Sequence, residues 1–499
     1  MQGIFAREFK PKRIIDNPPE EKLREWALEQ GGVITEFGNL SVVTHTRNRI
    51  AGLTDVIMAE PDTEHARLVH KVMEYLREKE MIRLDRVMCQ TPGFTRNCRL
   101  YVTAEYPRLP LMWGNTLFPT HGGEPDFIAI TVPEWPEKKV LVFPETGMTL
   151  ILGSDYKGEN KKAMLRQVMY WAKKEGNLGL HAASKIMRVF RDGKLQDFGF
   201  LLFGLSGTGK TALSCHSHWL RPPERVMIRQ DDVVILRSDG SAIGTEESFY
   251  LKTENLEPSS QPLLYAAAIS PRAILENVCV DPESGKVDFF NTDLTSNGRG
   301  MVKRSDIAFT DSKIDLEKVD CMIFITRHYD IMPPVVRLSQ EWAAAAFMLG
   351  ESIETSAGDP TQAGKALRVV GTNPFIIGEG EVEGNLLLGL LRNNPNIQCF
   401  IVNTGKIGGE DGGQKITHRD SLKVLEMIAR DKIVWRKDEF WGYEVPVEIP
   451  EVDMNRFDLG HYYIEEQVQK MSRDLKRERL EWLAKFPRLD KDVIAALNP

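Results

Sequence analysis

The sequence lacks the features that mark membrane and secreted proteins. No apolar run approaches the roughly 18 residues that a helix needs to span a bilayer. The first residues, MQGIFAREFKPKR, contain no apolar segment of the secretory type. The six cysteines include no C-x-x-C pair, which is typical of reduced, mostly buried thiols in a cytoplasmic protein. These are Cys89, Cys98, Cys215, Cys279, Cys321 and Cys399.

The sequence also lacks a large excess of charge of either sign. Its formal net charge is −7 over 499 residues, which disfavours nucleic acid and membrane surfaces as the main partners. Hydrophobic residues make up 42% and charged residues 27%, as in ordinary globular proteins. A chain of this length is expected to form two or three domains around sizeable cores.

Internal repeats and long low-complexity segments are absent, and strand and helix patterns alternate instead. In the first half we expect helices over residues 21–30, 66–80 and after Gly158, and strands over 125–133 and on both sides of a turn at 145–147. In the second half we expect strands within 197–203, 225–236, 321–326 and 397–405, and one or two amphipathic helices from residue 465. This alternation predicts an α/β protein.

A glycine-rich segment, FLLFGLSGTGKTALS, occupies residues 200–214. It follows the phosphate-binding pattern G-x-x-x-x-G-K-S/T, because glycines let backbone N–H groups converge on phosphate oxygens and the next helix adds its dipole. Lys210 would reach the β- and γ-phosphates, and the Thr211 hydroxyl would bind Mg²⁺. The expected nucleotide-binding loop comprises Gly204, Leu205, Ser206, Gly207, Thr208, Gly209, Lys210 and Thr211.

Two adjacent aspartates, Asp231 and Asp232, follow the apolar run VMI where a strand is expected to end. Carboxylates in this position hold Mg²⁺ directly or through water. On a strand the two side chains would point to opposite faces, so they would serve two metal ions, or one metal ion and one structural contact. A solvated turn is the alternative interpretation.

Further candidate residues lie in an ordered set of segments around this loop. They are Tyr156, Lys161 and Lys162 in SDYKGENKKAML, His181 in GLHAAS, Lys252 in FYLKT, Glu276 in ILENV and Arg299 in TSNGRG. Taken singly, a pair of adjacent lysines usually lies on a solvated helix face, and a single histidine more often has a structural role than binds a ligand. Together with GLSGTGKT, MPPVVRLS and FIVNTG, the set resembles the ATP-dependent phosphoenolpyruvate carboxykinases over roughly residues 90 to 430.

The resemblance implies a two-lobed α/β fold with the active site in the cleft. A mixed-sheet, substrate-side lobe would cover residues 1–190, a phosphate-loop lobe 191–450, and a C-terminal helical extension 451–499. The first boundary is drawn at the polar segment KIMRVFRDGKLQD, with a turn at 192–193. The implied partners are small-molecule substrates. The implied state of the protein is a monomer or a small homo-oligomer.

The resemblance also implies the chemistry. Oxaloacetate loses CO₂, and the enolate that remains takes the γ-phosphoryl group of ATP to give phosphoenolpyruvate and ADP, reversibly. Lys210 and Thr211 would hold ATP and its Mg²⁺, with Ser206 beside the transferred group and Asp231 orienting water on that ion. A second metal ion, usually Mn²⁺, would be bound by Lys162, His181 and Asp232.

On the substrate side, the resemblance assigns Tyr156 and Arg299 to oxaloacetate or phosphoenolpyruvate. Lys252 and Glu276 would support the phosphate site. The substrate carboxylate would be held by Arg96 in GFTRNCRLYV, with Arg99 as the alternative. Lys415 and Ser421 are further candidates for the nucleotide site.

Four segments depart from the family pattern. The F-T-G-R-S-P motif reads GFTRNC, the G-D-D-E-H-x-W segment reads QDDVVIL, the lid segment at 355–375 lacks E-P-T-P, and a family arginine is replaced by Lys415. Lysine cannot make the same bidentate, stacked contact. An alternative is therefore a related kinase with another acceptor, such as a different 2-oxo acid, another small molecule or a protein hydroxyl. A nucleotide sensor without catalysis is a third possibility, and the physiological direction, gluconeogenic or carboxylating, stays open.

Overall fold

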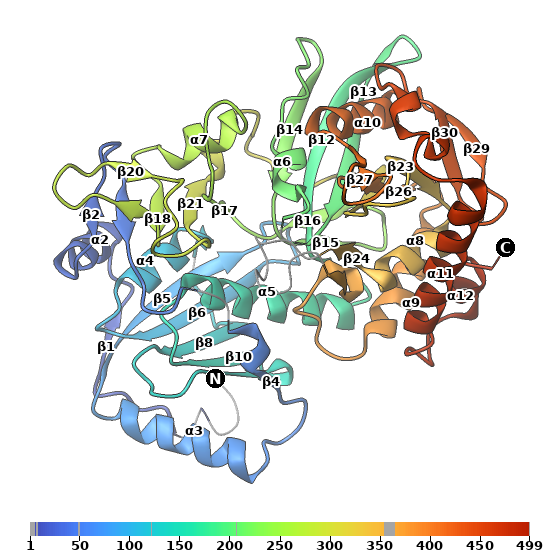
Figure 1. Ribbon diagram of the computed structural model, residues 1–499. Coiled ribbons are helices and arrows are strands. Elements are labelled where there is room, and N and C mark those ends of the chain that lie inside the picture. Colours follow the sequence, from blue (N-terminus) through green and yellow to red (C-terminus); the bar gives the residue numbers. More distant parts are fainter. Residues whose placement is uncertain are drawn as a thin grey trace. The chain divides into compact units, whose positions relative to one another are not determined.

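The computed structural model describes residues 5, 8–47, 50–120, 122–205, 207–353 and 365–498 (Figure 1). The chain forms two compact units, each built from two separate stretches. The first unit contains Met1–Trp171 and Thr245–Ala308, and the second contains Ala172–Gly244 and Phe309–Pro499. These units do not coincide with the linear division drawn from the sequence. The turn at 192–193, taken above as a boundary, joins two paired strands inside the second unit.

The first unit contains a large mixed sheet. Its strands, in spatial order, are β1 (Arg13–Asp16), β5 (Glu80–Met88), β6 (Arg96–Thr103), β8 (Phe127–Val132), β10 (Met148–Leu152), β9 (Lys139–Phe143) and β4 (Thr54–Val56), with β7 (Phe118–Pro119) paired to β5. The neighbours β6, β8 and β10 are parallel, and β9 and β10 are antiparallel. The predicted turn at 145–147 is confirmed, since Gly147 adopts a φ of +66° between β9 and β10. A Cβ there would lie 2.2 Å from the Asp126 carbonyl oxygen, which requires glycine.

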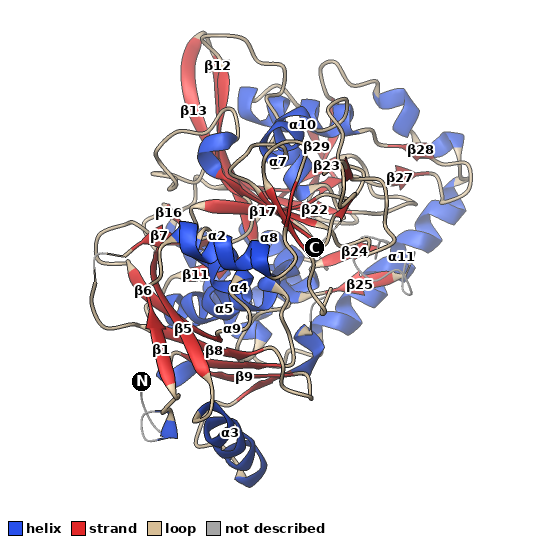
Figure 2. Ribbon diagram, turned by 90° about the vertical axis from the view of Figure 1, so that its left-hand side faces the viewer, coloured by secondary structure: helices blue, strands red, loops and turns tan. Residues whose placement is uncertain are grey.

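Helices cover both faces of this sheet, with α3 (Thr63–Leu76) and α5 (Lys157–Lys174) on opposite sides (Figures 1 and 2). The α3 helix begins at Asp62, whose carboxylate accepts hydrogen bonds from two backbone N–H groups. Its apolar stripe, which includes Val69 and Met73, packs into one core with the strands. From α5, Asn160 and Gln167 bond to β8 and β10. These contacts fix the helix that carries Lys161 and Lys162.

A second, five-stranded sheet completes the first unit. Its order is β17 (Ser248–Lys252), β21 (Arg299–Lys303), β18 (Ile274–Glu276), β3 (Leu40–Val42) and β2 (Val33–Ile34). The remaining elements are α2 (Glu20–Glu29), α4 (Arg108–Gly114), α7 (Pro262–Ala268), β19 (Cys279–Val280) and β20 (Val287–Asp288). Strands from the second stretch of chain thus pair with strands from the first, for example β18 with β3.

The second unit is organised around an eight-stranded mixed sheet. Its order is β14 (Arg225–Gln230), β12 (Ala182–Arg191), β13 (Lys194–Phe203), β22 (Cys321–Thr326), β26 (Gln398–Asn403), β23 (Val335–Leu338), β30 (Glu444–Glu448) and β29 (Val434–Lys437). The central strands β13, β22 and β26 are parallel, and most of their paired residues are apolar and buried. Mixed sheets in both units confirm the predicted α/β class.

Helices and short strands surround this sheet. Helices α8 (Gln340–Leu349), α9 (Gly380–Asn393), α11 (Glu465–Leu483) and α12 (Lys491–Ala495) share one core with it. The others are α6 (Lys210–Ser214) and α10 (His418–Arg430). Short strands are β11 (Leu178–Leu180), β15 (Val234–Leu236), β16 (Ala242–Gly244), β24 (Glu351–Ile353), β25 (Ala366–Arg368), β27 (Lys406–Ile407) and β28 (Gln414–Lys415). The predicted C-terminal amphipathic helices are therefore α11 and α12.

All six cysteines are free thiols, and five of them are buried, as expected. Among the described residues, no helix combines the length and apolarity that crossing a membrane requires.

A buried ion cluster attaches α11 to the two-stranded sheet of β24 and β25 in the second unit. Glu351 accepts hydrogen bonds from Arg479 Nε and Nη2 at 2.9 and 2.7 Å, and from Arg368 Nη2 at 2.9 Å. The Arg479 side chain is fully buried and lies over the ring of Trp441. Burial alone would raise the pKa of Glu351, but the charges of Arg479 and His328 hold that pKa well below its ordinary value of 4.5.

Removal of the Glu351 charge is expected to destabilise the second unit. Glu351→Gln leaves the buried Arg479 uncompensated, so the free energy of unfolding at pH 7 should fall by about 3 to 5 kcal/mol in denaturant titrations. Because the folded pKa of Glu351 is depressed, its stabilising contribution is present above pH 4.5 and is lost as the pH falls through the folded pKa. The control Glu444→Gln removes a half-exposed ion pair with Arg337 and should cost about 1 kcal/mol at most. Equal losses in the two variants would contradict the prediction.

Candidate functional site

The glycine-rich loop that the sequence predicts to bind phosphate lies in the second unit, between a strand and a helix. The strand β13 is exposed over its first four residues and buried over its last six, ends at Phe203 before the loop, and α6 begins at Lys210. Gly207 and Gly209 have φ values of +82° and +95°, which glycine adopts without strain. A Cβ at Gly204 would lie 2.5 Å from the Thr208 hydroxyl oxygen, so this close approach also depends on glycine. Ser206 lies outside the described residues.

The segment FIVNTG supports this loop. The Thr404 hydroxyl donates to the backbone carbonyl of Thr208 at 2.9 Å, and the Thr208 hydroxyl donates to the Leu205 carbonyl at 2.8 Å. Thr404 directly follows β26, which pairs with β22, the parallel neighbour of β13. The parallel strands therefore carry both the loop and the residue that braces it.

His181 and Asp232 meet in the second unit. His181 Nε2 lies 3.0 Å from Asp232 Oδ1, and both side chains are about 15% exposed. The other ring nitrogen, Nδ1, donates its proton to the Thr372 carbonyl at 2.7 Å, which fixes the ring. Asp231 and Asp232 lie in a bend directly after β14, so they follow a strand end, as predicted, rather than lying within a strand.

The donor atoms of this pair suit a divalent cation. A histidine whose Nδ1 is held by a carbonyl presents Nε2 as a ligand, and an adjacent carboxylate supplies oxygen. Within the described residues, no cluster of three or more histidine, cysteine, aspartate or glutamate side chains is arranged to hold a metal ion. The structure thus brings together two of the three residues predicted to bind the second metal ion. Lys162, the third, lies on α5 of the first unit beside Lys161, whose buried ammonium pairs with Glu246.

The two late nucleotide-site candidates differ in setting. Lys415 ends β28 and is exposed. Ser421 lies within α10, is 2% exposed, and donates its hydroxyl to the Thr417 carbonyl. That bond favours a role for Ser421 inside the helix.

Three predicted residues of the first unit form one row across the five-stranded sheet. Arg299 on β21 is paired with Lys252 on β17 and with Glu276 on β18. Residues paired in this way project from the same face of a sheet. The structure therefore brings Lys252, Arg299 and Glu276 together, although they are separated by long stretches of sequence.

Tyr250 on β17 and Lys157 on α5 lie next to this row, and neither was predicted from the sequence to be a site residue. Tyr250 lies two residues before Lys252 on β17 and donates its hydroxyl to Glu276. Its ring lies 4.0 Å from Lys157 Nζ and 5.4 Å from Arg299 Cζ, both measured to the ring centroid. Alternation along a strand places Tyr250 and Lys252 on one face, a signal available in FYLKT.

Tyr156 joins the same group through Asn297. The Asn297 amide donates to the Tyr156 hydroxyl at 3.3 Å, and Asn297 Oδ1 accepts from Arg299 Nη2 at 2.7 Å. Tyr156 is 2% exposed, and the Lys157 backbone N–H donates to Glu276 at 3.0 Å. The result is a buried cluster in which Arg299 and Lys157 both lie near the carboxylate of Glu276.

The ionisation of this cluster follows from its burial. Burial raises the pKa of Glu276, against the opposing effects of the Tyr250 hydroxyl and the cations nearby. Burial alone would lower the pKa of Arg299, but Tyr156, Tyr250 and Glu276 raise it. Burial also raises the pKa of Tyr250 well above 10. The arginine therefore remains charged and Tyr250 remains a hydrogen-bond donor at neutral pH.

The two candidates for the carboxylate-binding arginine can be distinguished. Arg99 makes a bidentate ion pair with Asp85, at 2.7 and 3.0 Å. Arg96 begins β6, and its guanidinium lies 4.7 Å from the ring centroid of Phe94. The bidentate ion pair with Asp85 counts against Arg99, so Arg96 stays the predicted candidate.

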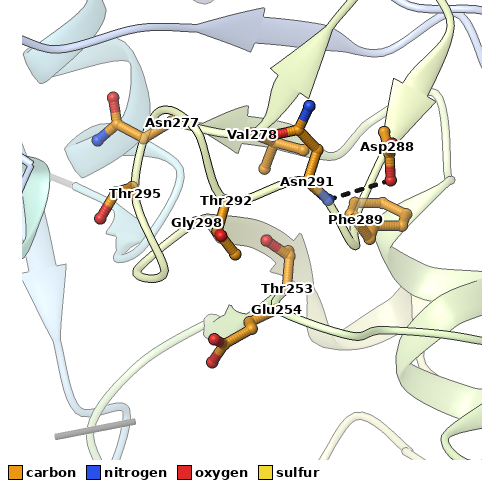
Figure 3. Close-up of a pocket in the computed structure, with 10 residues that line it drawn as sticks. All are labelled: Thr253, Glu254, Asn277, Val278, Asp288, Phe289, Asn291, Thr292, Thr295 and Gly298. Atoms are coloured by element: carbon orange, nitrogen blue, oxygen red, sulfur yellow. Dashed lines mark hydrogen bonds between the residues drawn. The ribbon is translucent and has the colours of Figure 1, made fainter. Parts of the chain in front are cut away.

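A small pocket adjoins the row where β17 and β18 end and β21 begins (Figure 3). The ten lining residues include Glu254 and Asp288 but no lysine or arginine. Glu254 is 2.5 Å from Lys252 Nζ. The carboxylates that line this pocket would repel a substrate dianion, so the row, rather than this pocket, is the candidate substrate-side site.

Comparisons with known proteins agree with the resemblance and extend it. The family model of phosphoenolpyruvate carboxykinase matches residues 12–455. A phosphoenolpyruvate carboxykinase (ATP) of Aeropyrum pernix is 36% identical over 97% of this chain and 97% of its own length. The enzymes of the same name from Thermus thermophilus and Shouchella clausii are each 28% identical, over 91% and 90% of this chain and 90% and 89% of their own lengths.

Proposed function

This chain belongs to the phosphoenolpyruvate carboxykinase family, and from that membership we infer that it converts oxaloacetate and ATP into phosphoenolpyruvate, CO₂ and ADP. The observation that carries the site assignment is the row of Lys252, Arg299 and Glu276, with Tyr156 attached through Asn297. A row rich in cations suits a dianionic 2-oxo acid, and the glycine loop suits the triphosphate.

We propose the following roles for the predicted residues in this reaction. As the bond to the departing CO₂ breaks, its electron pair moves to the enolate oxygen. Arg299 and Tyr156 hold the acceptor in place and offset the developing negative charge, while Arg96 holds a carboxylate. The enolate oxygen then attacks the γ-phosphorus in line, and the bond to the β–γ bridging oxygen breaks. Lys210 stabilises the oxygens of the transferred group, and Ser206 and Lys252 assist it.

Divalent cations complete the proposal. Mg²⁺ would be held with ATP by Thr211 and Asp231, and Mn²⁺ at a second site by Lys162, His181 and Asp232. Bound there, the cations would supply charge neutralisation for the enolate and for the phosphoryl group. The chain itself contributes the fixed His181 ring, because Thr372 holds Nδ1 and leaves Nε2 directed at Asp232.

We also propose that the enzyme acts in the cytoplasm as a monomer or a small homo-oligomer. The six free thiols support a reducing compartment. Light scattering of the purified protein would measure its oligomeric state.

The test is direct turnover. Purified protein is incubated with oxaloacetate, ATP, Mg²⁺ and Mn²⁺, with GTP and pyrophosphate as parallel donors, and phosphoenolpyruvate, ADP and CO₂ are measured. Equal amounts of the three products with ATP are expected. Absence of phosphoenolpyruvate and ADP above the blank would refute the assignment. Formation of ADP without oxaloacetate-dependent CO₂ would instead indicate a kinase with another acceptor.

A further inference from the structure

Lys185 is a fully buried lysine on β12 that the proposed chemistry does not use. A buried ammonium group is costly unless hydrogen-bond acceptors surround it. Lys185 Nζ donates to the Leu213 carbonyl at 2.5 Å and to His218 Nε2 at 2.6 Å. Leu213 belongs to α6, the short helix that follows the phosphate loop.

His218 continues this chain of contacts to α10. Its Nδ1 donates to the Leu422 carbonyl at 3.0 Å, so Nε2 is the acceptor for Lys185. Leu422 directly follows Ser421 on α10. His218 is 2% exposed, and its φ of +55° is a left-handed conformation that non-glycine residues adopt only when their surroundings hold them.

The resulting polar relay runs from Leu213 through Lys185 and His218 to Leu422 and joins α6 to α10. With only five residues, α6 has little internal hydrogen bonding, so external contacts must fix its orientation. A cation at the C-terminal carbonyls of a helix also complements the helix dipole. The loop that precedes α6 moves with it, because the two are continuous.

We propose that Lys185 and His218 form a positioning relay that holds α6, and with it the phosphate loop, in the orientation that binds the triphosphate of MgATP. This inference rests on the proposed function for its ligand. Lys185 acts through α6 and is a positioning residue.

The titratable groups around Lys185 give the relay a pH dependence. Burial lowers the pKa of Lys185 to about 7. Burial raises the pKa of Cys215 to about 12, lowers that of His216 to about 4, and lowers those of His218 and His418. On α10, the charge of Glu426 is compensated by Lys423 and Arg430. Near neutral pH, the charge of Lys185 therefore changes.

The sign of the pH effect follows. Below pH 7 the ammonium is protonated and holds the α6 carbonyl most strongly. As the pH rises through 7 this attraction weakens, so the Kd for MgATP should increase several-fold between pH 6 and pH 8. Lys185→Met should abolish that dependence and raise the Kd about tenfold at pH 6.

The experiment measures MgATP binding by calorimetry in the absence of oxaloacetate, so its result does not depend on which acceptor the enzyme uses. The matched control is Lys173→Met. Lys173 is also a mostly buried lysine of the second unit, but it bonds to the Ile377 carbonyl and to Glu383 instead of α6. This control should leave the Kd and its pH dependence unchanged. An equal effect in both variants would overturn the proposal.

A second pair of variants keeps the proposal testable if Lys185→Met does not fold. His218→Gln retains an acceptor near the position of Nε2, whereas His218→Leu does not. We expect the glutamine variant to bind MgATP within about twofold of the parent and the leucine variant to bind about tenfold more weakly. The same Kd in the parent and His218→Leu would overturn the relay. Normal MgATP binding without phosphoenolpyruvate formation would count against the proposed reaction alone.

Discussion

Lys210→Met is expected to lower kcat/KM by about 10³-fold, because it removes the cation that offsets charge on the transferred phosphoryl group. Lys210 begins α6 directly after the glycine at which the loop ends, so its position is set by the loop backbone. The side chain is partly exposed, and methionine keeps most of its apolar length. We therefore expect the melting temperature to change little while turnover is lost.

The measurement is steady-state formation of phosphoenolpyruvate with oxaloacetate and ATP varied separately. The control is Lys194→Met, at an exposed position that begins β13 at the other end of the strand. It should retain parental kinetics. A decrease in kcat/KM of less than tenfold in Lys210→Met would show that other residues hold the triphosphate.

His181→Gln should have the second large effect, on the response to metal ions. Loss of an imidazole ligand should raise the Mn²⁺ concentration for half-maximal activity about 10- to 100-fold, while MgATP binding measured by calorimetry stays nearly the same. The reason is that His181 contacts Asp232 and Thr372, whereas ATP is assigned to the phosphate loop. Direct Mn²⁺ binding, followed by electron paramagnetic resonance, gives a readout independent of turnover.

The chain offers a matched control for this variant. His65 Nε2 also lies 3.0 Å from an aspartate oxygen, that of Asp55 in the first unit. His65→Gln should leave the Mn²⁺ response unchanged. If His181→Gln destroyed MgATP binding and kept the Mn²⁺ response, the two-metal assignment would be wrong.

The parts that could be predicted from sequence depend on local patterns. The turn at 145–147 and the helix carrying Lys162 follow from glycine spacing and apolar periodicity, and the structure has both of them. It also has the predicted strand before the glycine-rich loop and the predicted helix after it. The resemblance selected Lys252, Glu276 and Arg299, but their alignment in one row depends on the register of three strands. Register is set by packing and by long connections, which no single segment encodes.

Contacts between residues far apart in the chain could not be predicted from the sequence for the same reason. The carbonyl that orients His181 belongs to Thr372, 191 residues further along the chain. Lys185 appears in sequence as one polar residue in the segment KIMRVFRDGKLQD, and its burial depends on α6 and α10. The division into units was missed because each unit combines two distant stretches.

The interleaving of the two units has a consequence for biosynthesis. The strand β13, which leads into the phosphate loop, pairs on one side with β12, its hairpin partner, but on the other with β22. Cys321 of β22 is synthesised 118 residues after Phe203, the last residue of β13 (321 − 203 = 118), which takes about 6 to 24 s on the ribosome. During that interval the apolar edge at Phe200 and Leu202 has no strand to pair with. We therefore expect the nascent chain to depend on chaperones from the synthesis of β13 until the synthesis of β22. We also expect refolding of the full-length protein to be slow, with the pairing of β13 and β22 as the limiting step.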